Sequence, residues 1–86
     1  NPKQPDALMQ MAELAQEAGN GLQARAFLER YTAVAPVTAA TLWLGRNIEL
    51  GLGDAAQAAR YSQRLKNEFP TSEEASRLFE AERAKP

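Results

Sequence analysis

Two residue types that carry much of protein chemistry are missing from this chain of 86 residues, which has no cysteine and no histidine. The first absence excludes disulfides and thiolate chemistry, and the second removes the commonest general base and metal ligand. Long apolar runs are missing too, since the ~20 apolar residues that cross a bilayer occur nowhere. We therefore predict no catalytic residues, no metal site, no cofactor and no membrane insertion.

An excess of charge of one sign is also lacking. Lysine and arginine number 10 against 11 aspartate and glutamate, which gives a net charge of −1. Because no basic field exists to attract phosphate backbones, we do not expect nucleic acid as a partner. The length suits a single domain with a modest core. The chain starts at Asn1 rather than methionine, and we expect it to be a fragment of a longer repeat protein.

The sequence repeats itself at an offset of 34 residues. Pro2, Pro36 and Pro70 are spaced by this offset. The same offset joins Leu8 to Leu42, Gly19 to Gly53, Gln23 to Gln57, Ala24 to Ala58 and Arg30 to Arg64. A period of this length is typical of helical repeats, and it predicts one repeat over 5–38 and a second over 39–72.

Each matched position has a role in a helix-turn-helix unit. Gly19 and Gly53 suit the left-handed conformation that ends a helix, and Pro36 and Pro70 cannot continue one. Asn20 and Asp54 are predicted N-caps, with Gln23 and Gln57 completing capping boxes, and Thr71 with Glu74 forms another such box. These signals predict helices over 5–18, 21–34, 38–52, 55–68 and 72–84, the last a capping helix.

The apolar residues of these helices are expected to form one core. Small residues let the helices approach closely, and larger residues fill the space around them. The predicted core comprises Leu8, Met11, Ala12, Leu14, Ala24, Leu28, Tyr31, Ile48, Ala58, Tyr61, Leu65 and Phe69. No stretch alternates apolar and polar residues for long enough to predict a strand, so the expected fold class is all-α.

Over nearly its whole length the chain resembles tetratricopeptide repeat proteins. The resemblance rests on Leu8, Met11, Ala12, Gly19, Ala24, Leu28, Tyr31 and Pro36. It implies a right-handed α-α superhelix of two helical hairpins plus a C-terminal capping helix. It also implies a non-catalytic module that binds a protein or peptide partner.

A narrower resemblance involves residues 42–48, 52–54, Tyr61 and 69–73. This part is similar to the C-terminal part of the type IV pilus biogenesis/stability proteins, the PilF/PilW pilotin family. The resemblance implies help with secretin assembly or outer-membrane localisation, and a periplasmic location at the outer membrane through a parent lipoprotein. Two alternatives remain open: structural capping repeats of a larger scaffold with a different partner, and a cytoplasmic location.

Tetratricopeptide stacks present their first helices along a concave surface, which places the candidate partner-binding residues. They are Met9, Glu13, Gln16, Trp43, Asn47, Leu50 and Arg77. Tryptophan and arginine are enriched among binding hot spots. Trp43 could equally pack on Met9 or Phe79 inside the stack, so its place in the core or on the binding surface stays open at this point.

Overall fold

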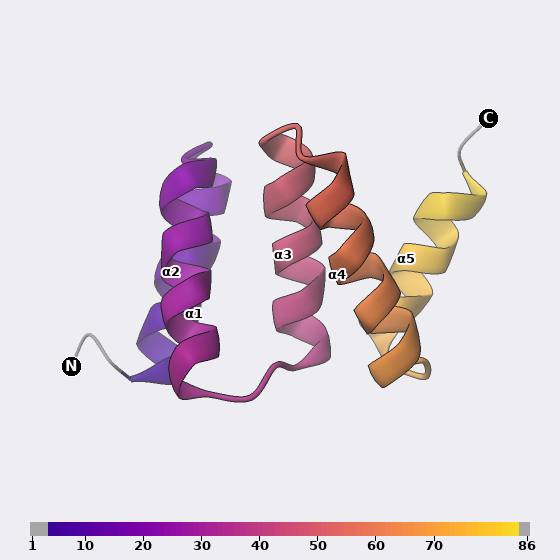
Figure 1. The fold of residues 1–86 in the computed structure, drawn as a ribbon, viewed down its shortest axis with the longest axis horizontal. Coiled ribbons are helices and arrows are strands. Elements are labelled where there is room, and N and C mark those ends of the chain that lie inside the picture. The colour runs from indigo at the N-terminus through magenta and orange to yellow at the C-terminus, as the bar shows by residue number, and fades with distance from the viewer. Residues whose placement is uncertain (1–3, 85–86) are drawn as a thin grey trace.

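The computed structural model describes residues 4–84, and this part of the chain consists of five helices (Figure 1). They are α1 (Pro5–Glu17), α2 (Gly21–Val34), α3 (Ala39–Gly51), α4 (Ala55–Glu68) and α5 (Glu73–Arg83). No strand occurs among these residues, so the predicted all-α class is confirmed. Each predicted helix agrees with the observed one to within a residue at either end. Within residues 4–84, no helix is long and apolar enough to span a membrane.

Consecutive helices form two antiparallel hairpins, α1 with α2 and α3 with α4, and α5 packs beside the second hairpin (Figure 1). The glycines close the first helix of each hairpin as predicted, since Gly19 and Gly53 have φ of +81° and +80°. At the first closure, the Asn20 amide donates to the Ala15 carbonyl at 2.8 Å and the Gly19 amide donates to Gln16 at 3.1 Å. Two equivalent bonds follow at Gly53, so both helices end in the same Schellman motif.

The predicted N-caps of the second helices are confirmed at one hairpin only. The Asp54 carboxylate accepts from the Gln57 amide at 3.1 Å, whereas Asn20 makes no side-chain cap bond. A carboxylate is the stronger acceptor at the positive end of a helix. In a capping box, the side chains of Gln23 and Gln57 would accept hydrogen bonds from the backbone amides of Asn20 and Asp54. These amides already donate to carbonyls of the preceding helices. The predicted capping boxes are therefore wrong at both sites.

The caps of α3 and α5 also differ from expectation. At α3 the Thr38 amide donates to Thr41 Oγ1 at 2.7 Å and the Thr41 amide donates back to Thr38 Oγ1 at 3.2 Å. This reciprocal box was not predicted, because its partner is threonine rather than glutamate or glutamine. At α5 the cap is Ser72, which accepts from the Ala75 amide at 3.0 Å, so the prediction of Thr71 was wrong by one residue.

Two buried clusters form the core. The first joins the two hairpins, and it comprises Ala12, Ala15, Ala24, Leu28, Leu44 and Ile48. The second holds α5 against α3 and α4, and it comprises Leu42, Leu65, Ala75 and Leu78. Leu8 and Ala58 are buried as predicted, and Phe69 packs against the second cluster.

Met11 and Leu14 do not belong to the core, and their predicted burial was wrong. Their side chains are 40% and 64% exposed. One period later, Ile48 is buried because residues of the α1–α2 hairpin cover it, and Gly45 is buried beneath the Tyr61 ring of α4. No described element covers the corresponding side of α1, so the same positions stay open there.

Gly45 marks the closest approach between helices of the second hairpin. A Cβ atom at this position would lie 2.5 Å from the Tyr61 ring, so the ring packs directly on the α3 backbone. Half-burial of Tyr61 raises the pKa of its hydroxyl, since the phenolate would lose solvation.

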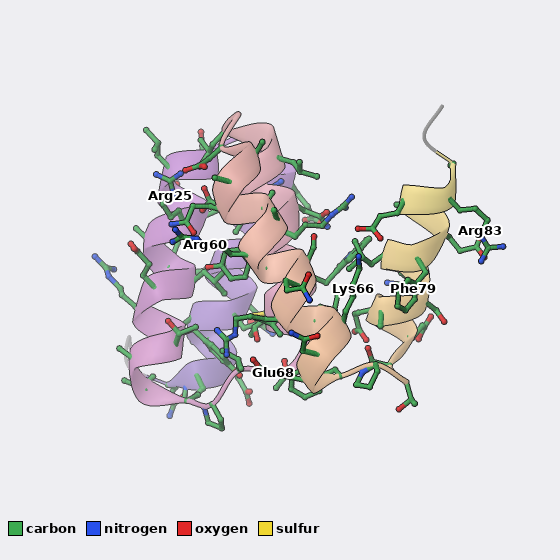
Figure 2. The ribbon with its side chains drawn as sticks, turned by 45° about the vertical axis from the view of Figure 1, so that its right-hand side comes forward. Arg25, Arg60, Lys66, Glu68, Phe79 and Arg83 are labelled. Atoms are coloured by element: carbon green, nitrogen blue, oxygen red, sulfur yellow. The ribbon has the colours of Figure 1, made fainter. Side chains whose placement is uncertain are left out.

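An ion pair also joins the hairpins. Arg25 of α2, labelled in Figure 2, makes two hydrogen bonds to the Glu49 carboxylate of α3, with a Nε–Oε2 distance of 3.0 Å. The Glu49 side chain is only 5% exposed, so this pairing satisfies a carboxylate that would otherwise be buried alone. The hydrogen bond to Glu49 raises the pKa of Arg25 above its usual value.

Candidate partner-binding groove

A hollow of about 340 Å³ runs across α1, α3 and α5, and we call it the groove. Its lining comprises Met9, Glu13, Gln16, Glu17, Ala40, Trp43, Leu44, Asn47, Glu74 and Arg77. Six of the seven residues predicted from the sequence therefore lie together: Met9, Glu13, Gln16, Trp43, Asn47 and Arg77. Whether they bind a partner stays a prediction.

The repeat explains why these residues converge. Met9, Trp43 and Arg77 are separated by one period each, so they occupy the same position on α1, α3 and α5. Successive hairpins place that position on the same side of the stack. Contacts of α3 with both α1 and α5 keep the three helices adjacent.

Amide side chains connect two of the walls of the groove. Gln16 Nε2 donates to the backbone carbonyl of Asn47 at 3.3 Å, which joins α1 to α3. The Asn47 side chain accepts in turn from Arg46 Nη1 at 2.8 Å. The Asn47 amide group keeps its two N–H donors for another acceptor, such as a peptide carbonyl.

Trp43 belongs to the core and to the groove at once. The side chain is partly buried and packs against the second cluster, yet it also lines the groove. Arg46 lies over the ring, with its guanidinium carbon 4.9 Å from the ring centroid. Such stacking favours a fixed ring orientation. The two roles weighed for Trp43 therefore do not exclude each other.

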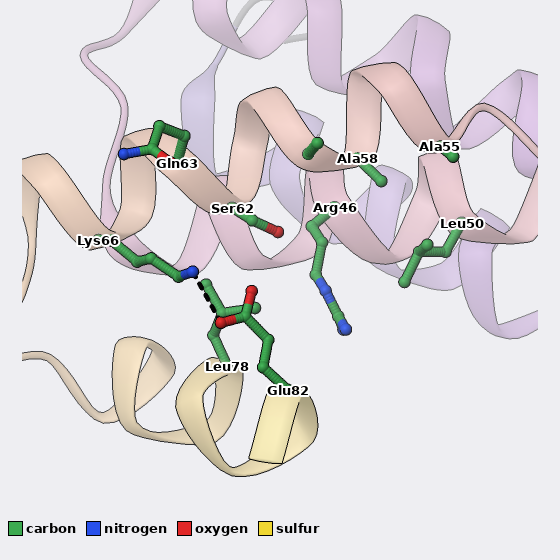
Figure 3. Close-up of a pocket in the computed structure, with 10 residues that line it drawn as sticks. Arg46, Leu50, Ala55, Ala58, Ser62, Gln63, Lys66, Leu78 and Glu82 are labelled. Carbon is green, nitrogen blue, oxygen red and sulfur yellow. Dashed lines mark ion pairs between the residues drawn. The ribbon is translucent and has the colours of Figure 1, made fainter. Parts of the chain in front are cut away.

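Leu50 lies elsewhere. It lines a second hollow between α3, α4 and α5, which we call the junction hollow (Figure 3). Leu50 is two helical turns beyond Trp43, where α3 faces the C-terminal half of α5. The junction hollow is lined by Arg46, Leu50, Ala55, Ala58, Ala59, Ser62, Gln63, Lys66, Leu78 and Glu82.

Carboxylates outnumber cations in the lining of the groove. Glu13, Glu17 and Glu74 contribute three carboxylates, against the single cation Arg77. Arg77 is itself paired with Glu73 at 2.9 Å. Sequence reasoning missed Glu17 and Glu74, although each lies one helical turn from a predicted residue, Glu13 or Arg77. Among residues 4–84, no group of acidic side chains is arranged to hold a metal ion.

One part of the chain is similar to a known protein family. Residues 39–72 match the family model described as Tetratricopeptide repeat, and this range covers α3, α4 and the cap of α5. No curated protein and no solved structure matches the chain significantly. Tetratricopeptide repeats typically bind protein or peptide partners and typically act as non-catalytic scaffolds. Residues 39–72 thus match a tetratricopeptide repeat, and the described chain has an all-α helical-repeat fold of that type.

Proposed function

We propose that this chain is a non-catalytic protein-binding module whose groove holds a segment of its partner. The observation that carries the proposal is the convergence of Met9, Trp43 and Arg77 from successive helices on one hollow. Large, rigid aromatic side chains and arginine supply most of the binding energy in typical interfaces. The partly buried Trp43 is held in place before binding, which lowers the entropic cost of association.

The lining of the groove indicates the chemistry of the bound segment. Met9 and Trp43 offer apolar contact area, and Glu13 and Glu17 offer negative charge. A segment that carries a lysine or arginine beside an apolar side chain would satisfy both. Charge complementarity of this kind raises association rates and selects against acidic partners.

We further propose that the partner is a secretin subunit or another pilus assembly component. The support is the resemblance of residues 42–48 and 69–73 to the pilotin family, because the first of these segments supplies Trp43 and Asn47. In this proposal the parent is a lipoprotein, and the module works in the periplasm at the outer membrane.

Fluorescence tests this proposal directly, because Trp43 is the sole tryptophan of the chain. Adding a soluble secretin fragment is expected to change the Trp43 emission in a saturable way. Asn47→Ala keeps the reporter and is expected to weaken binding about tenfold, as for loss of one hot-spot contact. Glu13→Gln with Glu17→Gln should reduce the association rate, most strongly at low salt.

Leu22→Ala is the matched control, since Leu22 is exposed on α2 and does not line the groove. Its affinity should equal that of the unaltered chain. Unchanged affinity of Asn47→Ala would rule out the groove, and absence of any secretin binding would rule out the pilus role.

A second candidate function is structural: the chain serves as capping repeats of a larger tetratricopeptide scaffold. The exposed Leu14 favours it, because the α1–α2 hairpin covers its equivalent, Ile48, one period later. A tandem variant that duplicates residues 5–38 ahead of Pro5 supplies such a hairpin. Burial of Leu14 there is expected to stabilise the chain by about 1.5–3 kcal/mol, measured by urea unfolding.

The control for the tandem variant carries Leu14→Lys in the original copy. A lysine at this position cannot enter the apolar junction without a large desolvation cost, so the added stability should disappear. Equal stability of the tandem protein and the single chain would contradict the capping role.

A further inference from the structure

The junction hollow is the place where the molecule departs from its own repeat. In the first junction, Leu28 and Ile48 are buried in the cluster between the hairpins. One period later the same positions hold Ser62 and Glu82, which line the junction hollow. Polar residues therefore stand where two apolar side chains would close the junction, and a hollow of about 270 Å³ remains.

Arg46 is the third departure, since Ala12 occupies the equivalent position in the first junction. Two contacts fix its guanidinium group: the Trp43 ring, and the bond that Nη1 donates to Asn47. Figure 3 shows the side chain extending from α3 toward the space beside α5. Within residues 4–84 no carboxylate forms an ion pair with Arg46, and most of its five N–H donors have no acceptor there.

The remaining charges of the junction hollow cancel each other. Lys66 of α4 pairs with Glu82 of α5 at 2.7 Å, as the dashed line in Figure 3 marks. Lys66 also lies 5.7 Å from the Phe79 ring centroid, which holds it toward α5 (Figure 2). Arg46 therefore gives the hollow one uncompensated positive charge. Leu50, which is 46% exposed, supplies apolar area beside it.

We propose that the junction hollow is a second binding site, which takes an aspartate or glutamate side chain of a partner polypeptide. The guanidinium group of Arg46 receives the carboxylate, and the exposed Leu50 contacts an apolar neighbour of the acidic residue. Charge complementarity selects this occupant. The guanidinium group is held in place, and its N–H donors without an acceptor can form two parallel hydrogen bonds to a planar carboxylate. The site is separate from the groove, whose carboxylates repel the same ligand.

Two capped peptides test this site against the ¹⁵N-labelled chain by nuclear magnetic resonance. The probe is acetyl-Leu-Asp-Leu-amide, and its neutral match is acetyl-Leu-Asn-Leu-amide. The aspartate peptide is expected to shift the Arg46 Nε–H and Ser62 amide signals saturably. The asparagine peptide should bind about tenfold more weakly, because a charge-assisted bond is replaced by a neutral one.

Three variants locate the interaction. Arg46→Gln should remove the preference for the aspartate peptide, and Ser62→Leu should block both peptides by filling the hollow while leaving Arg46 in place. Arg83→Gln removes the same positive charge at an exposed position of α5, and this variant should keep the preference for the aspartate peptide. Trp43 emission shows whether Arg46→Gln has disturbed the neighbouring ring.

Several outcomes would overturn the proposal. One is equal affinity for the two peptides, or an undiminished aspartate preference in Arg46→Gln. Another is a set of shifts centred on Met9 and Glu13, which would place the peptide in the groove. Displacement of the peptide by an equal concentration of inorganic phosphate would indicate a general anion site rather than one for an acidic side chain.

Discussion

Replacing Ile48 with alanine is expected to lower the free energy of unfolding by about 2–5 kcal/mol, the range for a fully buried aliphatic side chain. Ile48 has no exposed surface, and it fills the junction between the hairpins together with Ala12, Ala24 and Leu28. The truncation leaves a cavity that the surrounding helices α1, α2 and α4 cannot collapse to fill, because each is tied to its hairpin partner at a tight turn. Urea unfolding followed by circular dichroism measures the loss.

The repeat provides the control for this prediction. Leu14 occupies the same position one period earlier but is 64% exposed, so Leu14→Ala should change stability by only about 0.5 kcal/mol or less. Two variants at one repeat position would then differ greatly because of burial alone. Similar losses for both would mean that Leu14 is covered in solution, for example by a second copy of the chain.

Filling the junction hollow is expected to have a large effect of the opposite sign. The double variant Ser62→Leu with Glu82→Ile restores the residue types that close the first junction. Burial of the two side chains should raise the free energy of unfolding by about 2–4 kcal/mol, after allowance for incomplete burial. For a domain of this size the melting temperature would rise by roughly 4–8 °C per kcal/mol. The lost pair of Glu82 with Lys66 is partly exposed and subtracts little.

The matched control places the same two changes on the outer surface of α5, as Ser76→Leu with Glu80→Ile. Both positions are exposed, so this variant should gain little stability. An equal gain in both double variants would show that helix propensity, and not filling of the hollow, is responsible. A gain confined to the junction variant, with loss of aspartate-peptide binding, would show that polarity at this junction is kept for binding at the expense of stability.

Most of the fold could be predicted from the sequence because its signals are local. In both hairpins a glycine with φ near +80° ends the first helix, and a proline follows the second helix, so the helix ends follow from residue type. The groove could be predicted because the period fixes which residues share one side of the stack. The details of capping could not, since the Asn20 amide is consumed by the preceding helix.

The errors in the core have a different cause. Met11 and Leu14 have the hydrophobicity of core residues, but burial requires a neighbouring element, which residue type does not specify. Leu50 follows the groove-facing periodicity of α3, yet the position of α5 assigns it to the junction hollow. Arg46 stands where the first repeat has alanine, and only its contacts with Trp43 and Asn47 show that it is held in place.

The groove and the junction hollow carry opposite charge, and Arg46, which lines the junction hollow, contacts Trp43 and Asn47 of the groove. A partner chain that reaches from one to the other would have to enter with its basic stretch toward α1 and its acidic stretch toward α4. Threading in the reverse direction would bring like charges together at both ends, which costs free energy. The surface of α3 would therefore fix which end of a bound segment lies toward α1, in addition to selecting its composition.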